Sequence, residues 1–135
     1  MAYCFDTDVL SAVLRREPSL PLVRRMAQIP PEDQFTTSIT LGELLYGSAR
    51  RQSPTLTARV RQLVGQLVAI VPFDAGAAET YGSLRAKLEG DGTPLAEPDL
   101  RIASVALTRG LTLVTGNVRH FGRVPKLSVE NWLDR

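Results

Sequence analysis

The stretch LVTGNVRHF, residues 113–121, decides how the fold of this chain is interpreted. Its first residues are apolar, as in a buried strand, whereas Thr115, Gly116 and Asn117 favour a turn. In open parallel α/β sheets, ligands bind at the carboxyl ends of the strands. The small polar residues that end this core strand could therefore form part of a ligand site. Other functional residues of the site would have to come from elsewhere in the chain.

The bulk composition is typical of one globular domain. The chain has 135 residues, of which 44% are hydrophobic and 22% charged, enough for a substantial core. No apolar stretch is long enough to span a membrane, and the first residues do not resemble a signal peptide. The single cysteine, Cys4, cannot form an internal disulfide. We therefore expect a single cytoplasmic domain over residues 1–135, with no membrane partner.

The basic residues are mostly arginines. Of 16 Lys and Arg residues only Lys87 and Lys126 are lysines, and the formal net charge is +2. Arginine suits bidentate contact with phosphate, so paired arginines could form a surface for nucleic acid. They could equally be solvated helix faces, and the sequence leaves both alternatives open.

Hydrophobic periodicity predicts strands that alternate with helices. The expected strands are 2–5, 34–39, 68–73, 111–115 and 126–131, and the expected helices are 8–16, the segment between Pro18 and Pro30, 40–51, 55–67, 75–89 and 98–108. Such alternation implies right-handed crossovers and a mainly parallel sheet with helices on both faces. The predicted fold class is α/β.

Four polar residues stand at or near strand ends. Asp6 directly follows the first strand and Asn117 follows the strand 111–115, so a parallel sheet places both at one edge. A helix that begins at Thr40 would bring Glu43 to the same edge. Asp99 lies in the first turn of the helix that precedes the strand 111–115, and its spacing does not fix the edge at which it lies.

Helix capping offers a structural alternative for each of these positions. On this interpretation Asp6, Thr7 or Asp8 caps a helix, Glu43 is the capping-box partner of Thr40, Asp99 complements a helix dipole and Asn117 caps a turn. Together, however, three converging carboxylates would repel one another. A hard divalent cation such as Mg²⁺ or Mn²⁺ would remove that conflict and leave coordination positions for phosphate oxygens.

The segments FDTDVLSAVL (5–14), TTSITLGELLYGSARR (36–51), GTPLAEPDLRIASVAL (92–107) and LTLVTGNVRHFGRVPKLSVENWL (111–133) resemble the PIN domain, specifically the VapC-type toxin ribonucleases of bacterial toxin–antitoxin operons. These motifs cover nearly the whole chain in the family's order. The resemblance implies a catalytic set of Asp6, Glu43, Asp99 and Asn117, in which the three acids hold the metal, Asn117 stands where many relatives carry a fourth acid, and Thr7 and Thr115 support the carboxylates. Capping remains an equal alternative for both threonines.

The resemblance also implies an activity. The expected enzyme is a Mg²⁺-dependent endoribonuclease, with Mn²⁺ as a substitute, that leaves 5′-phosphate and 3′-hydroxyl ends on an RNA such as transfer or ribosomal RNA. Arg85 and Arg119 are candidates for contact with the RNA backbone. For His120, the only histidine, a role as ligand or acid/base is the alternative to the expected one, which is a dispensable residue on a surface helix.

A protein partner is implied by the same resemblance. A cognate VapB-type antitoxin would cover the cleft, insert a basic side chain among the acids and contact apolar grooves on the early helices. The expected assemblies are a homodimer and, with antitoxin, a heterotetramer or larger. The residues that could line such a groove are mostly expected to be core: Leu10, Val13, Leu14, Leu44, Leu45 and Tyr46.

Two other functions fit part of the sequence. FDTDVL also resembles the D-x-D opening of haloacid-dehalogenase phosphatases, but the two lysines stand in unsuitable places for that fold. A response-regulator receiver has a similar early acid pair but needs a phosphoacceptor after a middle strand, which does not occur here. A catalytically inactive, partner-binding PIN domain is the remaining alternative, and the presence of all three acids weighs against it.

Overall fold

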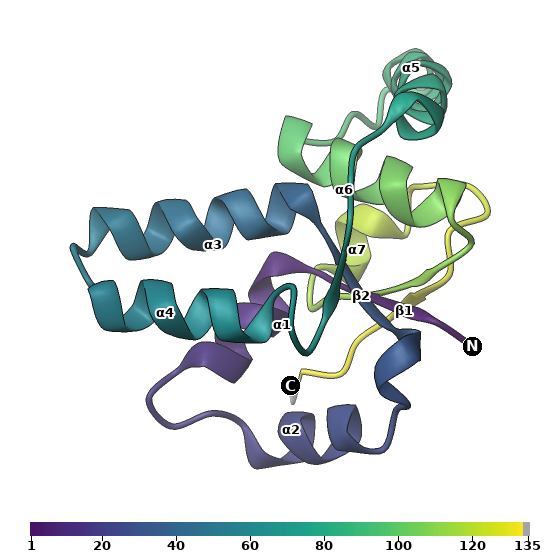
Figure 1. Ribbon diagram of the computed structural model, residues 1–135. Coiled ribbons are helices and arrows are strands. Elements are labelled where there is room, and N and C mark those ends of the chain that lie inside the picture. Colours follow the sequence, from purple (N-terminus) through teal and green to yellow (C-terminus); the bar gives the residue numbers. More distant parts are fainter. Residues whose placement is uncertain (134–135) are drawn as a thin grey trace.

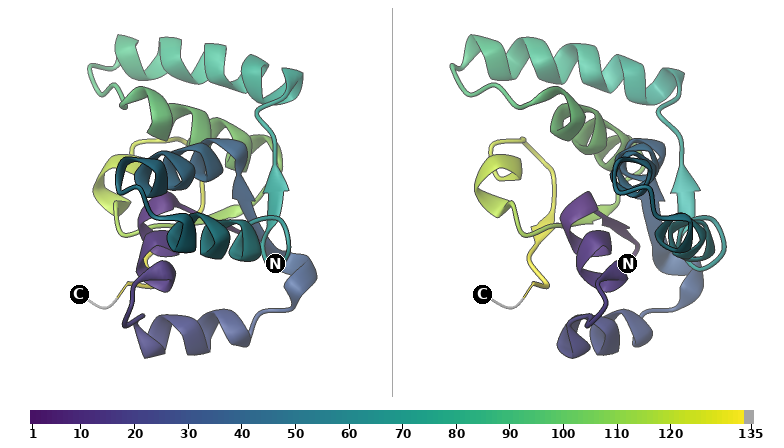
Figure 2. Two further views of the ribbon diagram at one scale, coloured as in Figure 1. Left: turned by 60° about the vertical axis from the view of Figure 1, so that its left-hand side comes forward. Right: turned by 90° about the vertical axis from the view of Figure 1, so that its left-hand side faces the viewer.

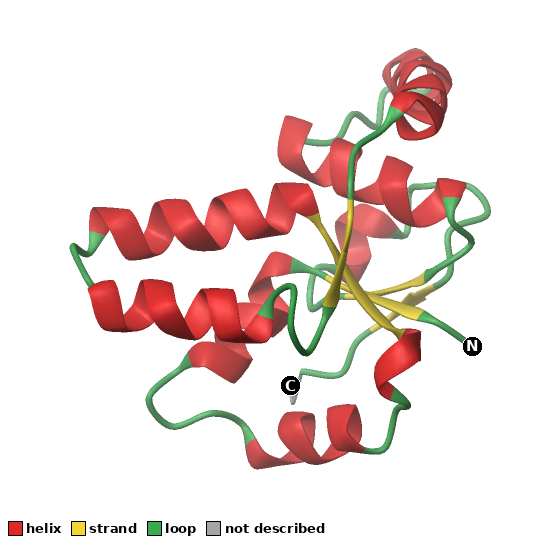
Figure 3. Ribbon diagram, viewed as in Figure 1, coloured by secondary structure: helices red, strands yellow, loops and turns green. Residues whose placement is uncertain are grey.

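A computed structural model describes residues 1–133 of the chain. Five strands form one sheet in the order β3-β2-β1-β4-β5, and each neighbouring pair is parallel. The predicted α/β class with a parallel central sheet is confirmed (Figure 1, Figure 3). The strands are β1 (Tyr3–Phe5), β2 (Gln34–Thr37), β3 (Ala69–Val71), β4 (Thr112–Val114) and β5 (Val129–Glu130).

Helices cover both faces of this sheet. In Figure 2, α5 and α6 lie on one side of the strands, and α1 and α2 lie on the other. In Figure 1, α3 and α4 form a pair that extends away from the sheet. Their bounds are α1 (Thr7–Leu14), α2 (Leu20–Ala27), α3 (Ser38–Arg50), α4 (Pro54–Leu63), α5 (Ala75–Gly90), α6 (Glu97–Thr108) and α7 (Val118–Phe121), with a short 3₁₀ turn, η1 (Pro31–Asp33), before β2.

The two central strands explain why the sheet has two cores. Side chains alternate between the faces of a strand, so Cys4 and its partner Leu113 belong to the core under α5 and α6. Phe5 and its partner Val114 belong to the core under α1, α2 and α4. All four are fully buried. Because β1 and β4 end at paired residues, the residues that follow the two strands lie side by side.

The start of α3 differs from the prediction. The expected strand 34–39 ends at Thr37, and Thr37 is the N-cap of α3, because its hydroxyl accepts a hydrogen bond from the Thr40 N–H at 3.0 Å. The predicted capping box of Thr40 and Glu43 is therefore wrong. The Glu43 side chain is free from capping and takes part in another contact, described below.

The last strand is also shorter than predicted. β5 is limited to Val129–Glu130, and Lys126 has a positive φ of 68°, which interrupts an extended conformation at that point. Beyond β5, the Trp132 ring lies against Tyr3 and Phe5, with ring centroids 4.9 and 5.5 Å away. No helix within residues 1–133 is both long enough and apolar enough to cross a membrane.

Candidate active site

The turn after β4 is fixed to the end of β1. The Asp6 N–H donates to the Val114 carbonyl at 2.9 Å, which continues the β1–β4 ladder by one residue. The Thr115 hydroxyl then donates to Asp6 Oδ2 at 2.7 Å and accepts a hydrogen bond from the Asn117 N–H at 3.0 Å. The small polar residues after β4 therefore hold the first acid of the site in place, as was predicted for Thr115.

Asp6 has a structural role as well as a place in the site. It is the N-cap of α1, and its Oδ1 accepts a hydrogen bond from the Thr7 N–H at 2.7 Å. Only 6% of the residue is exposed. Capping and membership of an acidic site are thus compatible at this position, because a carboxylate at a helix N-terminus is stabilised by the helix dipole.

A threonine of α1 connects Asp6 to Glu43. The Thr7 hydroxyl donates to Glu43 Oε1 at 2.6 Å and lies 3.1 Å from the Thr40 hydroxyl. The prediction that Thr7 contacts a carboxylate is confirmed, although the carboxylate is Glu43 and the Thr7 hydroxyl does not reach Asp6. α1 and α3 are linked at this point across 36 residues of sequence.

Asp99 reaches the same edge of the sheet, which the spacing had left open. It lies in the first turn of α6, which has Pro98 in that turn and no side-chain cap. The chain from α5 to α6 brings this helix N-terminus to the carboxyl ends of the strands. One cleft of about 460 Å³ is then lined by Asp6, Thr7, Asp8, Glu43, Asp99, Gly116 and Asn117.

Burial and mutual repulsion raise the pKa values of two acids in this cleft. Burial raises the pKa of Asp6 to about 6, the charges of Asp8 and Asp99 add to the rise, and the hydrogen bonds from Thr115 and Thr7 oppose it. Burial also raises the pKa of Asp99, as do Glu43 and Asp8, whereas the nearby His120 lowers it. The acids thus feel one another's charge.

Within residues 1–133, no basic side chain forms an ion pair with these acids: no Lys, Arg or His nitrogen lies within 4.0 Å of a carboxylate oxygen of the cleft. An oxygen-only, negatively charged donor set suits a hard divalent cation such as Mg²⁺. Oδ1 of Asp8 is buried without a hydrogen-bond partner, which is a second sign that the cleft needs a positively charged occupant.

The acids do not form a ready-made ligand cage. In the described part of the chain, no three Asp, Glu, His or Cys side chains converge closely enough to hold an ion. Mutual repulsion keeps carboxylates apart, and Thr7 and Thr115 hold Glu43 and Asp6 separately. Mg²⁺ binds one or two carboxylates directly and keeps several waters, so the donors fit such an ion. That a single ion bridges Asp6, Glu43 and Asp99 stays a prediction.

Asn117 and His120 form a pair at the rim of the cleft. Asn117 stands at the N-cap position of α7, but its side chain makes no capping hydrogen bond. Its Oδ1 is instead hydrogen-bonded to Nδ1 of His120, which is exposed on α7 as predicted for a surface helix residue. Through this contact and its influence on Asp99, His120 belongs to the surroundings of the site.

Sequence reasoning left Asp8 out of the metal site and considered it as a helix cap or as the second acid of a haloacid-dehalogenase-like D-x-D opening. Its side chain lines the cleft, and its Oδ2 accepts a hydrogen bond from the Gly116 N–H at 3.0 Å. The signal was present in the D-x-D spacing of residues 6–8. Because Asp6 is itself the cap, Asp8 falls in the first turn of α1, where its side chain is available for other contacts.

The two arginines proposed for RNA contact lie in different surroundings. Arg85 is on α5, where it donates to Glu89 and to the Tyr81 hydroxyl, and it does not line the cleft. Arg119 is exposed on α7, two residues after Asn117. Arg119 does not line the cleft either, although it is close in sequence to Asn117, which does. RNA contact by either arginine stays a prediction.

A groove lies between α1, α3 and α4 and adjoins the cleft. It shares Thr7 and Glu43 with the cleft and is also lined by Leu14, Leu44 and Arg51, among others. Of the apolar residues predicted for a partner groove, Leu14 and Leu44 line this one. Leu10 is fully buried core, whereas Tyr46 is 64% exposed on α3.

Residues 3–127 match the sequence profile of the PIN-domain family. The chain belongs to the PIN-domain family. It is 32% identical over 132 residues to the tRNA(fMet)-specific endonuclease VapC of Shigella flexneri, covering 98% of both chains. It is 32% identical over 133 residues to Ribonuclease VapC2 of Haemophilus influenzae, covering 98% of this chain and 99% of that one.

Solved VapBC structures contain a chain with the same architecture over 98% of this one. The chain superposes on a structure of DNA-bound VapBC from Salmonella typhimurium with a TM-score of 0.87 and is 30% identical to it in sequence. The match covers 98% of this chain and 99% of that chain. VapBC2 from Rickettsia felis, bound to a promoter DNA fragment, gives 0.84 at 29% identity, with 98% and 100% covered. These similarities do not favour the haloacid-dehalogenase alternative.

Proposed function

We propose that this PIN domain is an endoribonuclease toxin that hydrolyses RNA phosphodiester bonds with Mg²⁺, or Mn²⁺, as its cofactor. The single observation that carries the proposal is the acidic cleft at the carboxyl ends of β1 and β4. The relatives named as VapC ribonucleases match this chain over nearly its full length, which supports RNA as the substrate.

The chain's own residues would divide the work as follows. Asp6, Glu43 and Asp99 supply the oxygens that hold the ion, and Thr115 and Thr7 keep the first two carboxylates in position. A divalent ion in such a cleft activates water and offsets the charge on the scissile phosphate. Asn117 contributes hydrogen bonds without adding charge, and we expect products with 5′-phosphate and 3′-hydroxyl ends.

The substrate is expected to be a structured RNA. One relative is named as specific for tRNA(fMet), so initiator transfer RNA is the first substrate to test. We infer that Arg119, which is exposed on α7 two residues after Asn117, contacts the RNA backbone, because a guanidinium binds phosphate oxygens in pairs. Arg85 is the weaker candidate, since its side chain already contacts Tyr81 and Glu89.

A VapB-type antitoxin is the proposed protein partner. Relatives of the chain were solved as VapBC complexes. The groove between α1, α3 and α4 would receive an apolar antitoxin segment, and its shared wall with the cleft would let a basic side chain reach the acids. We further propose a cytoplasmic homodimer that forms a heterotetramer or larger assembly with the antitoxin.

Two acids in the first turn of α6 give a matched test. Asp99 lines the cleft, whereas Glu97 contacts Tyr81 on the outer surface. Cleavage of initiator transfer RNA in Mg²⁺ should fall about 100-fold or more in Asp99→Asn, because an ion ligand is worth several kcal/mol in the transition state. Cleavage by Glu97→Gln should remain within about twofold.

The same assay separates the enzyme from an inactive, partner-binding domain. Asp6→Asn should lose cleavage as Asp99→Asn does, and EDTA should abolish the activity of the unaltered protein. Equal cleavage by the unaltered protein and both variants would identify a contaminating nuclease or a different site, and would overturn the proposal.

A further inference from the structure

Asp8, the second acid of the D-x-D motif at residues 6–8, has a position that its structural role does not fully explain. Asp6 caps α1, so Asp8 is not needed as the cap. A negative charge in the first turn of a helix is favourable, but only weakly so at an exposed position. Asp8 is instead partly buried and faces the cleft.

One oxygen of Asp8 is satisfied and the other is not. Oδ2 accepts a hydrogen bond from the Gly116 N–H at 3.0 Å, which joins α1 to the turn after β4. Oδ1 is buried without a partner, and within residues 1–133 no other buried side-chain nitrogen or oxygen lacks one. An unpaired buried carboxylate oxygen is costly, so it indicates a ligand that the protein chain does not itself provide.

The surroundings indicate the charge of that ligand. Asp8 lines the same cleft as Asp6, Glu43 and Asp99, so a ligand bound beside it meets several carboxylates. The other oxygen donor on this side of the cleft is neutral, because position 117 is an asparagine whose Oδ1 is hydrogen-bonded to His120. Asp8 therefore adds the one further negative charge on the side formed by Gly116 and Asn117.

We propose that Asp8 is the fourth carboxylate of the ion site, with its buried Oδ1 directed to the cation or to a water bound to it. This inference rests on the proposed function, since it requires a divalent ion in the cleft. It assigns to Asp8 the negative charge that the neutral Asn117 does not supply, and it makes the acidic set Asp6, Asp8, Glu43 and Asp99.

Asp8→Asn tests the charge while keeping the structural hydrogen bond. The asparagine oxygen can still accept from the Gly116 N–H, so the link between α1 and the turn after β4 is preserved. Isothermal titration with Mn²⁺ and with Mg²⁺ should give an affinity at least about tenfold weaker than that of the unaltered protein, the usual loss when a group supporting a metal site is replaced.

Glu97→Gln is the control, because it removes a first-turn helix acid outside the cleft and changes the net charge equally. Its affinity for both ions should equal that of the unaltered protein. Urea unfolding in EDTA provides the second measurement. Asp8→Asn should be as stable as the unaltered protein or more stable, since one of four crowded charges is gone.

The outcomes separate this inference from the proposed function. If the unaltered protein binds ions and Asp8→Asn binds them equally, the role of Asp8 is overturned and the nuclease proposal stands. A loss of stability in EDTA that accompanies the loss of affinity would also overturn it, because Asp8 would then be structural. If the unaltered protein binds neither ion, both proposals are overturned.

Discussion

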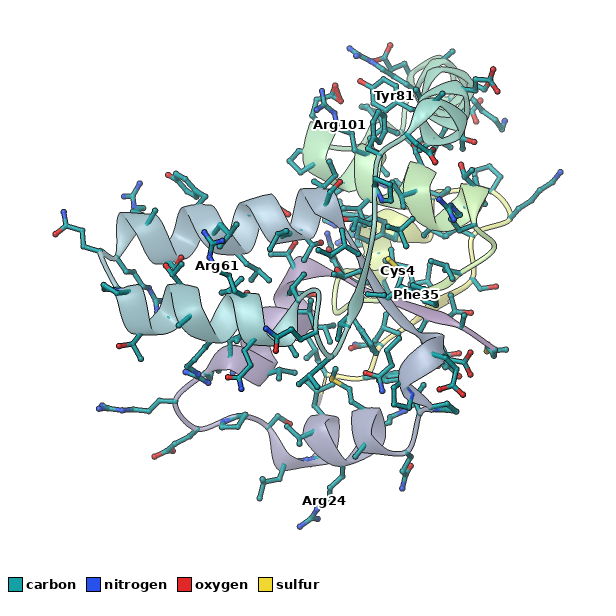
Figure 4. The ribbon with its side chains drawn as sticks, in the orientation of Figure 1. Cys4, Arg24, Phe35, Arg61, Tyr81 and Arg101 are labelled. Carbon is teal, nitrogen blue, oxygen red and sulfur yellow. The ribbon has the colours of Figure 1, made fainter. Side chains whose placement is uncertain are left out.

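Acidic residues occur in two contrasting regions of this molecule, and α6 contributes to both. On the outer face of α5 and α6, which we call the paired face, Glu97 accepts from the Tyr81 hydroxyl at 2.8 Å and lies 3.5 Å from Arg85 and 3.8 Å from Arg101. Figure 4 shows Tyr81 and Arg101 together on this side. Two residues after Glu97, Asp99 faces a cleft whose acids form no ion pair within residues 1–133.

The two regions differ in their effect on the stability of the fold: the paired acids add to it slightly, whereas the crowded acids lower it. Exposed ion pairs such as those of the paired face contribute little, typically 0–1 kcal/mol. Crowded and partly buried carboxylates lower the stability of the folded state, because repulsion and desolvation both disfavour their charge. A chain that keeps such a cluster loses stability that a bound cation can restore. The predictions below compare the two regions from the largest effect to the smallest.

Adding a divalent ion should have the largest effect. At a concentration of Mg²⁺ or Mn²⁺ 100 times the dissociation constant, binding stabilises the fold by about 2.7 kcal/mol, which for a domain of this size raises the Tm by about 5–10 °C. The rise, measured by calorimetry against EDTA, should be absent in Asp6→Asn and retained in Glu97→Gln. Equal shifts in both variants would mean that the ion binds outside the cleft.

Removing the charge of Asp6 should stabilise the metal-free protein. The folded pKa is raised from 3.8 to about 6, so between these values the folded state holds a proton that the unfolded state has released. The free energy of unfolding therefore falls as the pH rises through this window, by about 3 kcal/mol in total. Asparagine does not titrate, and it caps a helix as well as aspartate.

Urea unfolding of Asp6→Asn in EDTA should therefore show two features. At pH 7 the variant should be more stable than the unaltered protein by about 2–3 kcal/mol, and below about pH 4 the difference should disappear. If the free energy of unfolding changed with pH in the same way for both proteins, Asp6 would ionise normally, and its burial and the neighbouring acids would not destabilise the fold. A matching change of charge on the paired face, Glu97→Gln, should not give this gain of stability at pH 7.

The sequence predicted the elements of this site better than its contacts. Strand ends are set by local residue types and by the alternation of strands and helices, so Asp6 and Asn117 could be placed at one edge from the parallel sheet. Glu43 could be placed there from the helix that follows the second strand. The edge at which Asp99 lies depends on the chain between α5 and α6, whose path is set by packing. Periodicity carries no information about that path.

Side-chain partners were harder to predict because each threonine and acid has several possible hydrogen bonds. Thr37 caps α3 in place of Thr40, and this shift of three residues leaves Glu43 to accept from Thr7. Asp8 was missed for a related reason: capping explained it adequately until the structure assigned the cap to Asp6. Only the tertiary arrangement reveals that an oxygen of Asp8 is buried without a partner.

Thr115→Val should have an intermediate effect, since it removes the hydroxyl that donates to Asp6 Oδ2. The loss of a buried hydrogen bond to a charged group should cost about 2 kcal/mol at pH 7. Because this bond lowers the pKa of Asp6, the variant should lose more stability above pH 6 than below pH 4. Thr115→Ser keeps the hydroxyl and should keep the pH profile; the same pH dependence in both variants would assign the effect to packing.

Glu97→Gln should have the smallest effect on stability. The side chains of Glu97 and Arg85 are 47% and 50% exposed, so water and salt screen their attraction, and glutamine can still accept from the Tyr81 hydroxyl. We expect a loss of at most about 1 kcal/mol in urea unfolding, and a smaller one in 0.5 M salt. A larger, salt-resistant loss would show that the paired face anchors the N-terminus of α6, and Glu97 would then hold Asp99 in the cleft instead of serving as its neutral control.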